Sequence, residues 1–541
     1  MSTRALPCFA PLTLLLACTG ADGPVAAKGG ADSAADSGAG GADSDANGDG
    51  EGEGGGPDGP VIWGEVQACP SPLPSPTYVE HGADLGFLPR QEDDGSHLAG
   101  SSLAVEDLDQ DGDLDIVQTI LGSPMTVYWQ TSGSYLAEPV GPVAERGRLT
   151  LEDVDQDGAV DLMAGPIWWR SEPGGLGGQA AVRGFPTTLH PMDMMASDFN
   201  GDALIDYFAV VSSPTTDAED RRDAALYADG ADSFSVAPIE GPDGTGNAAQ
   251  GSLVDWDGDG DLDVYLTNDM GAFYGGNRLY QADDGVFSSV SATGCLPTFA
   301  GMAHTFGDYD RDGDEDIFIG GTLDSVLLRR EETGGCVDFS APLAADPLAA
   351  RDPRSNPMVW ATSFLDFDND GRLDILASEG DLYHAPGSGG ITLPAYEAPI
   401  DLLQQQEDGR FLNVGAALGL AETGSHRAVL AEDLNGDGVQ ELLVADVDEP
   451  LRVYMSTGCT AAAWLRVEAP PHTTVTVEAG GGVWTAVTRR ERGVGAAGPS
   501  AVHIGLGDVA EVDRVVLRPL QGEPLELAGP FSPRRTLRWA P

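Results

Sequence analysis

The sequence predicts an all-β fold: a seven-bladed β-propeller followed by a small C-terminal β module. One aspartate pattern, Asp-x-Asp-x-Asp-Gly-x-x-Asp, recurs seven times between residues 107 and 441, at intervals that average near 54 residues. Short β-branched and aromatic runs flank these acidic turns, as expected of strands in hairpins. A period of this length with about four strands per unit is typical of a propeller blade.

The first 18 residues predict export. Arg4 precedes an apolar stretch, residues 5–17, that is too short to span a bilayer as a mature helix and is typical of a signal peptide. The stretch ends in Leu-Leu-Ala-Cys18, which resembles the lipobox of bacterial lipoproteins. That resemblance makes Cys18 the lipidated first residue of an exported protein, anchored at the outer membrane or cell surface of a bacterium. A plain secretory peptide is the alternative.

Residues 19–61 are almost entirely Gly, Ala, Asp, Ser and Glu, and the first aromatic residue after them is Trp63. Such a segment buries too little apolar surface to offset its chain entropy, so we expect a disordered acidic tether. The expected propeller then covers residues 62–458, and the C-terminal module covers residues 459–541.

Candidate metal ligands stand at offsets 0, 2, 4 and 8 of each repeat. Five copies carry four aspartates: Asp107, Asp109, Asp111 and Asp115; Asp153, Asp155, Asp157 and Asp161; Asp255, Asp257, Asp259 and Asp263; Asp308, Asp310, Asp312 and Asp316; and Asp366, Asp368, Asp370 and Asp374. Two weaker copies carry Asp198, Asn200, Asp202 and Asp206, and Asp433, Asn435, Asp437 and Glu441. In the first weak copy, Ala203 replaces the glycine at offset 5.

This spacing predicts calcium as the cofactor, with up to seven sites. Alternate residues in a tight turn place short carboxylates on one side, and Ca²⁺ takes six to eight oxygen ligands at about 2.3–2.6 Å. An EF-hand loop begins with a similar pattern, but it needs a glutamate at its twelfth position and a helix on each side. The twelfth positions here are occupied by Gln118, Ala164, Ala209, Leu266, Ile319, Ala377 and Val444. The EF-hand interpretation therefore fails.

The repeats resemble the FG-GAP/VCBS repeats of integrin α N-terminal propellers and of bacterial surface proteins. The tail resembles an ASPIC/UnbV module in three segments: Trp464–Val467, Val502–Gly507 and Val512–Leu517. This combination is similar to the cartilage acidic protein family in a bacterial lipoprotein form. The tail departs from the Asn-Arg-x-Gly-Ile-Gly run of that module, and Arg492–Gly495 is its displaced remnant. The resemblance implies calcium binding and a surface setting, and it implies no defined reaction.

Four cysteines lie beyond the expected signal peptide, an even number in an oxidising compartment. Spacing alone leaves three pairings open, and four free thiols are a further alternative. Because the two ends of a closed propeller meet, we expect Cys69 to pair with Cys459 and Cys295 with Cys336.

Composition and motifs favour binding over catalysis. Asp and Glu outnumber Lys and Arg by 87 to 28, which argues against a nucleic-acid partner. The sequence contains no His-Glu-x-x-His zinc motif, phosphate loop or Gly-x-Ser-x-Gly elbow, so we expect no catalytic residues. We expect an adhesion or interaction scaffold for an unidentified protein or glycan, with membrane contact only through the lipid. The alternative is a carbohydrate-active enzyme, a polysaccharide lyase or hydrolase, on a calcium-stabilised propeller.

Overall fold

The computed structural model describes parts of one compact unit, residues 55–541. The expected signal peptide with Cys18, and the tether up to residue 60, lie outside the described residues. Within the described part of the chain, no helix is long and apolar enough to cross a membrane. The described ranges are 61–87, 101–120, 124–143, 148–186, 191–211, 223–230, 233–239, 248–269, 271, 276–350, 357–380, 397–446 and 450–540.

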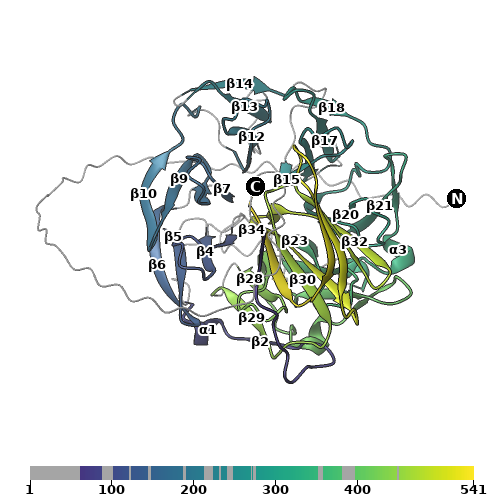
Figure 1. Cartoon of the computed structure of the whole chain (residues 1–541). Helices are drawn as coiled ribbons and strands as arrows, with labels where there is room; N and C mark the ends of the chain where they lie inside the picture. Colours follow the sequence, from purple (N-terminus) through teal and green to yellow (C-terminus); the bar gives the residue numbers. More distant parts are fainter. Residues whose placement is uncertain are drawn as a thin grey trace, which may run out of the picture. The chain divides into compact units, whose positions relative to one another are not determined.

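The chain between residues 78 and 456 forms antiparallel groups of four strands, which confirms the all-β prediction and fits the blades of a propeller. In chain order, the groups are β3 (Ser101–Glu106), β4 (Asp115–Ile120), β5 (Pro124–Thr131) and β6 (Ser134–Val143); β7 (Leu149–Glu152), β8 (Asp161–Ala164), β9 (Ile167–Glu172) and β10 (Gly175–Ala181); β11 (Asp193–Ser197), β12 (Asp206–Val210), β13 (Ala224–Ala228) and β14 (Phe234–Pro238); β15 (Ala248–Val254), β16 (Asp263–Asn268), β17 (Arg278–Gln281) and β18 (Ser288–Val290); β19 (Gly301–Gly307), β20 (Asp316–Gly321), β21 (Ser325–Arg330) and β22 (Cys336–Asp338); and β23 (Met358–Leu365), β24 (Asp374–Gly380), β25 (Asp401–Gln405) and β26 (Phe411–Asn413). Figure 1 shows these groups following one another along the chain.

The last group takes its outermost strand from the N-terminal end of the described chain. Its strands are β27 (His426–Glu432), β28 (Glu441–Asp446), β29 (Arg452–Ser456) and β2 (Tyr78–Glu80). In β2, Tyr78 pairs with Ser456 and Glu80 with Tyr454. Among the described residues, the helical segments with defined bounds are short: α1 (Gly82–Leu85), α3 (Ser340–Leu343), η2 (Pro347–Ala350) and η4 (Gly415–Leu418).

Apolar side chains fill the space between neighbouring groups. We call the first strand of each group (β3, β7, β11, β15, β19, β23 and β27) its inner strand; each lies against the inner strand of the next group, and β27 lies against β3. Phe208 and Val264 belong to one buried cluster that joins the third and fourth groups. Leu103 and Leu430 belong to another, which joins the first group to the last. Strands with a neighbour on both faces, such as β12 and β16, are buried at every position, and their continuous apolar runs follow from that.

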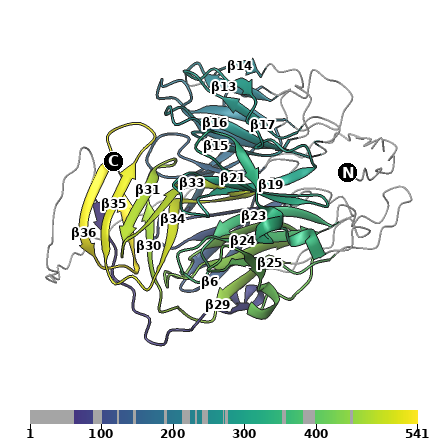
Figure 2. The ribbon, with the colours of Figure 1, turned by 90° about the vertical axis from the view of Figure 1, so that its right-hand side faces the viewer.

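The strands of the C-terminal module lie within residues 463–539. They form two sheets around a separate apolar core. These strands are β30 (Ala463–Glu468), β31 (Thr474–Ala479), β32 (Gly482–Val487), β33 (Arg489–Gly493), β34 (Ala496–Gly507), β35 (Val512–Arg518), β36 (Leu525–Phe531) and β37 (Arg535–Trp539). One sheet has the order β32-β31-β35-β36, and the other contains β37, β30 and β34. The two sheets share a core that includes Val477, Ile504 and Val515, and Figure 2 shows their strands side by side.

The hairpin of β33 and β34 lies against several inner strands. Ala496 of β34 pairs in parallel with Leu103 of β3, so the module and the first strand group share one sheet. On its other side the hairpin lies against inner strands β7, β19, β23 and β27. The run Arg492–Gly495, which the sequence marks as a displaced remnant of the module motif, forms the end of β33 and the turn of this hairpin.

Buried ion pairs hold this hairpin in place. Arg489 makes a two-point contact with the carboxylate of Glu315, and Arg490 lies 3.2 Å from Glu106. Arg466, on the neighbouring strand β30, contacts Glu432. Breaking a buried pair by removing one partner leaves an uncompensated charge, so these contacts fix how the module is seated.

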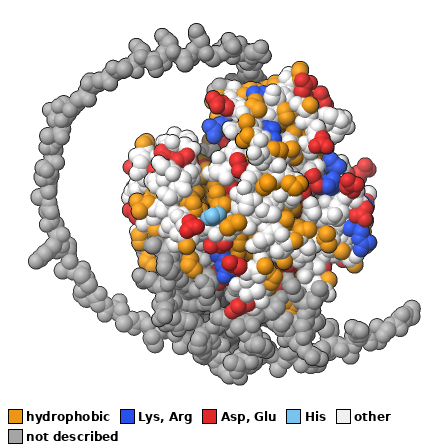
Figure 3. All heavy atoms as spheres, turned by 90° about the horizontal axis from the view of Figure 1, so that it is seen from below, with side chains coloured by type: hydrophobic (Ala, Val, Ile, Leu, Met, Phe, Trp, Pro, Cys, Tyr) orange, Lys and Arg blue, Asp and Glu red, His pale blue; other side chains and the backbone are white. Residues whose placement is uncertain are grey.

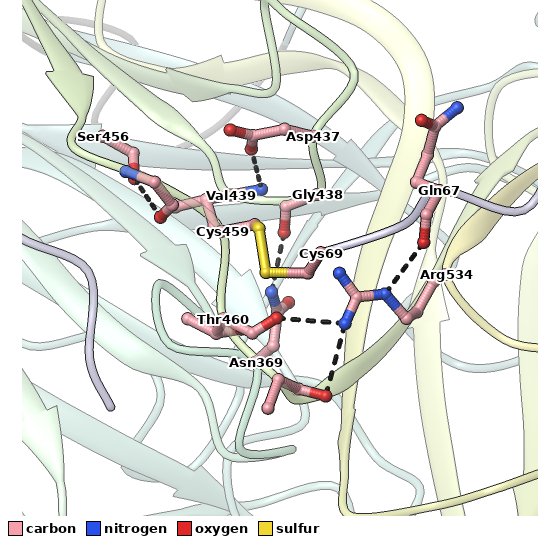
Figure 4. Close-up of a disulfide and its surroundings, with 12 residues drawn as sticks. Gln67, Cys69, Asn369, Asp437, Gly438, Val439, Ser456, Cys459, Thr460 and Arg534 are labelled. Carbon is pink, nitrogen blue, oxygen red and sulfur yellow. Dashed lines mark hydrogen bonds between the residues drawn. A yellow bond between two sulfur atoms is a disulfide. The ribbon is translucent and has the colours of Figure 1, made fainter. Parts of the chain in front are cut away.

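Two disulfides join parts of the chain that are distant in sequence. Cys69 bonds to Cys459 and Cys295 bonds to Cys336, the pairing expected from the closure of a ring. Around the first disulfide, Arg534 donates hydrogen bonds to the carbonyl oxygens of Gln67 and Thr460 (Figure 4). The N-terminal segment continues to β1 (Val61–Trp63), which pairs with β37 of the C-terminal module.

Candidate metal centres

Each acidic repeat forms the turn between the inner strand and the second strand of its group. The turn 107–115 joins β3 to β4, and the turn 433–441 joins β27 to β28. In every copy the acid at offset 8 is the first residue of the second strand. The sequence therefore places all seven turns at equivalent points of equivalent groups.

The backbone of these turns is left-handed at two positions, offsets 3 and 5. The residues with positive φ at offset 3 are Gln110, Gln156, Gly201, Gly258, Arg311, Asn369 and Gly436, and those at offset 5 are Gly112, Gly158, Ala203, Gly260, Gly313, Gly371 and Gly438. Glycine adopts such a conformation without strain, which explains why six of the seven copies have glycine at offset 5. The sequence does not reveal the positive φ at offset 3, because Gln, Arg and Asn occupy that position in four copies.

Replacing Ala203 by glycine should stabilise the protein. Ala203 has a φ of 67°, a region that costs a residue with a Cβ about 1 kcal/mol or more. We expect A203G to raise the free energy of unfolding by about 1 kcal/mol in urea titrations with calcium present. The matched control is A159G, at offset 6 of a neighbouring turn, where φ is not positive and glycine should only add chain entropy. Equal effects of the two variants would contradict the prediction.

The first acid of each turn closes it by accepting backbone hydrogen bonds. The amide of Asp111 donates to Asp107 Oδ1 over 3.0 Å, and the amide of Gly112 donates to Asp107 Oδ2 over 3.1 Å. The turn at 433 repeats this arrangement, with Asp437 and Gly438 donating to Asp433. These bonds curl the turn so that the acids at offsets 0 and 2 face the same side.

The last acid has a role that the sequence did not reveal: it fastens the third strand. Asp115 Oδ2 accepts from the amide of Leu108 over 3.1 Å, and its Oδ1 accepts from Gln130 of β5 over 2.9 Å. Asp263 does the same with Trp256 and with Ala282, just after β17. The repeat spacing could not show this because the distance along the chain to the third strand varies between copies.

The turns bring three carboxylates together in five copies. In each set one ligand atom per residue lies within 4.8 Å of the others: Asp107, Asp109 and Asp115; Asp153, Asp155 and Asp161; Asp255, Asp257 and Asp259; Asp308, Asp310 and Asp316; and Asp366, Asp368 and Asp374. Four copies thus gather offsets 0, 2 and 8, and the copy at 255 gathers offsets 0, 2 and 4, leaving Asp263 out. The copies at 198 and 433, in which Asn replaces Asp at offset 2, are not among these sets.

Burial makes the more deeply buried of these carboxylates poor anions unless a cation accompanies them. Burial, followed by the nearby Asp109 and Asp107, raises the pKa of Asp115 to about 7, and burial with Asp310 and Asp312 raises that of Asp316 to about 9. Burial also raises the pKa of Asp366 well above its ordinary value. A divalent cation in the turn would reverse this balance by supplying the missing positive charge.

The turn 308–316 gives a direct test of whether the residues fit a cation. Asp308 is 5% exposed, and its Oδ1 has no hydrogen-bond partner among the described residues, although its Oδ2 accepts from Gly313. A buried carboxylate oxygen without a donor is costly unless an ion meets it. All the gathered ligands are carboxylate oxygens, which suit the hard cation Ca²⁺.

On the face drawn in Figure 3, acidic side chains occur in several separate groups. The two disulfides are typical of proteins in an oxidising compartment.

Comparison with known proteins supports the repeat assignment. Residues 255–319 and 366–444 match the model of a family described as an FG-GAP-like repeat. No curated protein matches the sequence. Among solved structures, the chain is similar to BBS1N in complex with ARL6DN, at 8% identity, with 68% of this chain and 96% of that chain covered and a TM-score of 0.39. It is also similar to the extracellular domain of the one-component system BT4673 from B. thetaiotaomicron, at 12% identity, with 67% and 40% covered and a TM-score of 0.34.

Proposed function

We propose that the chain is an exported, calcium-binding β-propeller of seven blades that acts as a binding or adhesion scaffold. The contact of β27 with β3, together with the shared cluster of Leu103 and Leu430, supports a closed ring. The observation that carries the calcium assignment is the equivalent geometry of the acidic turns, five of which gather three carboxylates each. In this proposal the ions hold the turn and, through the acid at offset 8, the third strand of each blade.

The domain boundaries belong to the same proposal. The propeller spans residues 62–458, with β2 closing its last blade, and an ASPIC/UnbV-type module spans residues 459–541. The separate core of the C-terminal strands supports a module with its own interior. The buried ion pairs of the β33–β34 hairpin make that module a fixed part of the propeller.

The scaffold role means that the chain binds a protein or glycan and transforms nothing. Calcium would make the acidic turns rigid. A rigid binding surface loses less conformational entropy when it binds a ligand than a mobile one does. The purified chain should be screened on a glycan array and against surface proteins, in excess calcium and in excess chelator. Binding that needs calcium and leaves the ligand intact supports the scaffold. Depolymerised glycan in the same assay would favour an enzyme instead.

Replacing Cys18 by serine should release the protein from the membrane. The cysteine sulfur is the atom that the lipid would modify. Serine has a side chain of similar size but no sulfur, so it cannot take the lipid. We expect wild-type protein in the membrane fraction and C18S in the soluble extracytoplasmic fraction, measured by fractionation and immunoblotting. The matched control is C8S, inside the expected signal peptide, which should leave the anchoring unchanged. C18S that stays with the membrane would rule out the anchor.

A further inference from the structure

The acidic turns differ in their solvent exposure. In the turn 153–161, residues 155–158 are all exposed. In the turn 366–374 no residue is exposed, and its first acid, Asp366, is 3% exposed, whereas the corresponding Asp153 is half-buried. The two turns share the same spacing and the same backbone hydrogen bonds to the first acid, so something outside the turn covers the second one.

The C-terminal module supplies that cover. The indole N–H of Trp484 donates to the carbonyl oxygen of Gly371 over 3.0 Å, and the amide of Gly507 donates to that of Asn369 over 2.9 Å. His503 Nε2 lies 2.7 Å from Asn369 Oδ1. Three contacts from β32 and β34 thus reach the backbone and side chain of one acidic turn.

The strand β34 passes directly over the first ligand of this turn. A Cβ atom on Gly505 would collide with the carboxylate of Asp366 and with the backbone of Asn369, so only glycine allows this approach. The side-chain amide of Asn369 also donates to the carbonyl oxygen of Gly438 over 2.7 Å, which links the turn to its neighbour (Figure 4).

Charged contacts prevent the cover from lifting locally. The hairpin pairs Arg489 with Glu315 and Arg490 with Glu106. It belongs to the same module as Trp484 and Gly505, and it is buried among the inner strands. The cover can leave the turn 366–374 only if those contacts also move.

We infer that the chain has two kinds of calcium site: open sites, at the turns 107–115, 153–161 and 255–263, and one enclosed site, at the turn 366–374. This inference rests on the calcium binding proposed above. An ion in the enclosed site leaves only when the C-terminal module lifts, so its release is slow. Thermodynamic linkage makes this effect reciprocal. If the seated module raises the affinity of the site for calcium by a given factor, bound calcium raises the equilibrium constant for seating of the module by the same factor.

The test is the rate of calcium release from the full chain, measured by stopped-flow mixing of the calcium-loaded protein with a fluorescent chelator. We expect a fast phase from the open sites and a slow phase from the enclosed one. D368N, in the enclosed turn, should remove the slow amplitude, and D155N, in an open turn, should lower the fast amplitude. A single phase in the wild-type protein would overturn the inference.

Variants of the cover identify its role. W484A removes the indole donor and the whole ring system, and W484F removes the donor but keeps one aromatic ring; both should speed the slow phase, by about 10-fold for W484A. V483A changes the adjacent residue of β32, whose side chain is 50% exposed, and should leave both phases unchanged. A slow phase that is the same in W484A, W484F and wild type would overturn the inference. Equilibrium titration separates the two proposals, because a chain that binds no calcium refutes the proposed function itself.

Discussion

Removing calcium should lower the midpoint temperature of unfolding by about 10 °C or more. A ligand that binds only the folded state stabilises it by about 2.7 kcal/mol per site at 100 times its dissociation constant, and several turns contribute at once. Without the ion, carboxylates about 4 Å apart repel by about 4 kcal/mol per pair at an effective dielectric near 20. Calorimetry in excess calcium and in excess chelator measures the difference.

Magnesium provides the control for this experiment. Mg²⁺ demands near-octahedral geometry, holds its waters and is seldom bound by an all-protein cage, so excess Mg²⁺ should restore little of the lost stability. The same midpoint temperature in calcium and in chelator would mean that the acidic turns fold without ions. Equal recovery with both cations would mean that the turns respond to charge alone.

Removing the disulfide between Cys69 and Cys459 should cost about 6 kcal/mol of unfolding free energy in the chain-entropy model. The bond closes a sequence separation of 390 residues, and in the chain-entropy model a longer closed loop restricts the unfolded chain more. C69S/C459S should therefore unfold at a clearly lower guanidinium concentration than wild type, in excess calcium and without reductant.

The second disulfide is the matched control. Cys295 and Cys336 close a separation of only 41 residues, so C295S/C336S should lose about 2 kcal/mol less than C69S/C459S. Because Cys295 is fully buried in an apolar cluster, the alanine pairs C69A/C459A and C295A/C336A are compared as well; they bury no hydroxyl group and leave loop length as the main difference. Equal losses, or a greater loss from the short loop, would contradict the entropic explanation.

The local features of the fold could be predicted because they depend on neighbouring residues. The acids of each turn, the glycine at offset 5 and the β-branched run that follows all lie within about a dozen residues. The position of the turn between two strands therefore follows from the sequence alone. The pairing of Cys69 with Cys459 followed from the topology, once a closed ring was assumed.

The features that escaped prediction depend on contacts between distant residues. The sequence of the tail does not predict the ion pair of Arg489 with Glu315, or the hydrogen bond from Trp484 to the carbonyl oxygen of Gly371. One signal was present: Glu106, Glu152 and Glu432 directly precede the first acid of their repeats, and the tail contains the basic run 489–492 in an otherwise acidic chain. Charges of opposite sign in these two places are consistent with a buried ion pair. The repeat period does not distinguish such a pair from charges that are exposed to solvent.

The pairing of β1 with β37 and of β2 with β29 has a consequence for biosynthesis. During synthesis the N-terminal strands emerge first, and their partners emerge only after the intervening groups of four strands. The early groups of four strands can assemble as they appear, because their strands are consecutive in the chain. The final group must wait for the far end, and until then the edges of β1 and β2 are open to pairing with other chains.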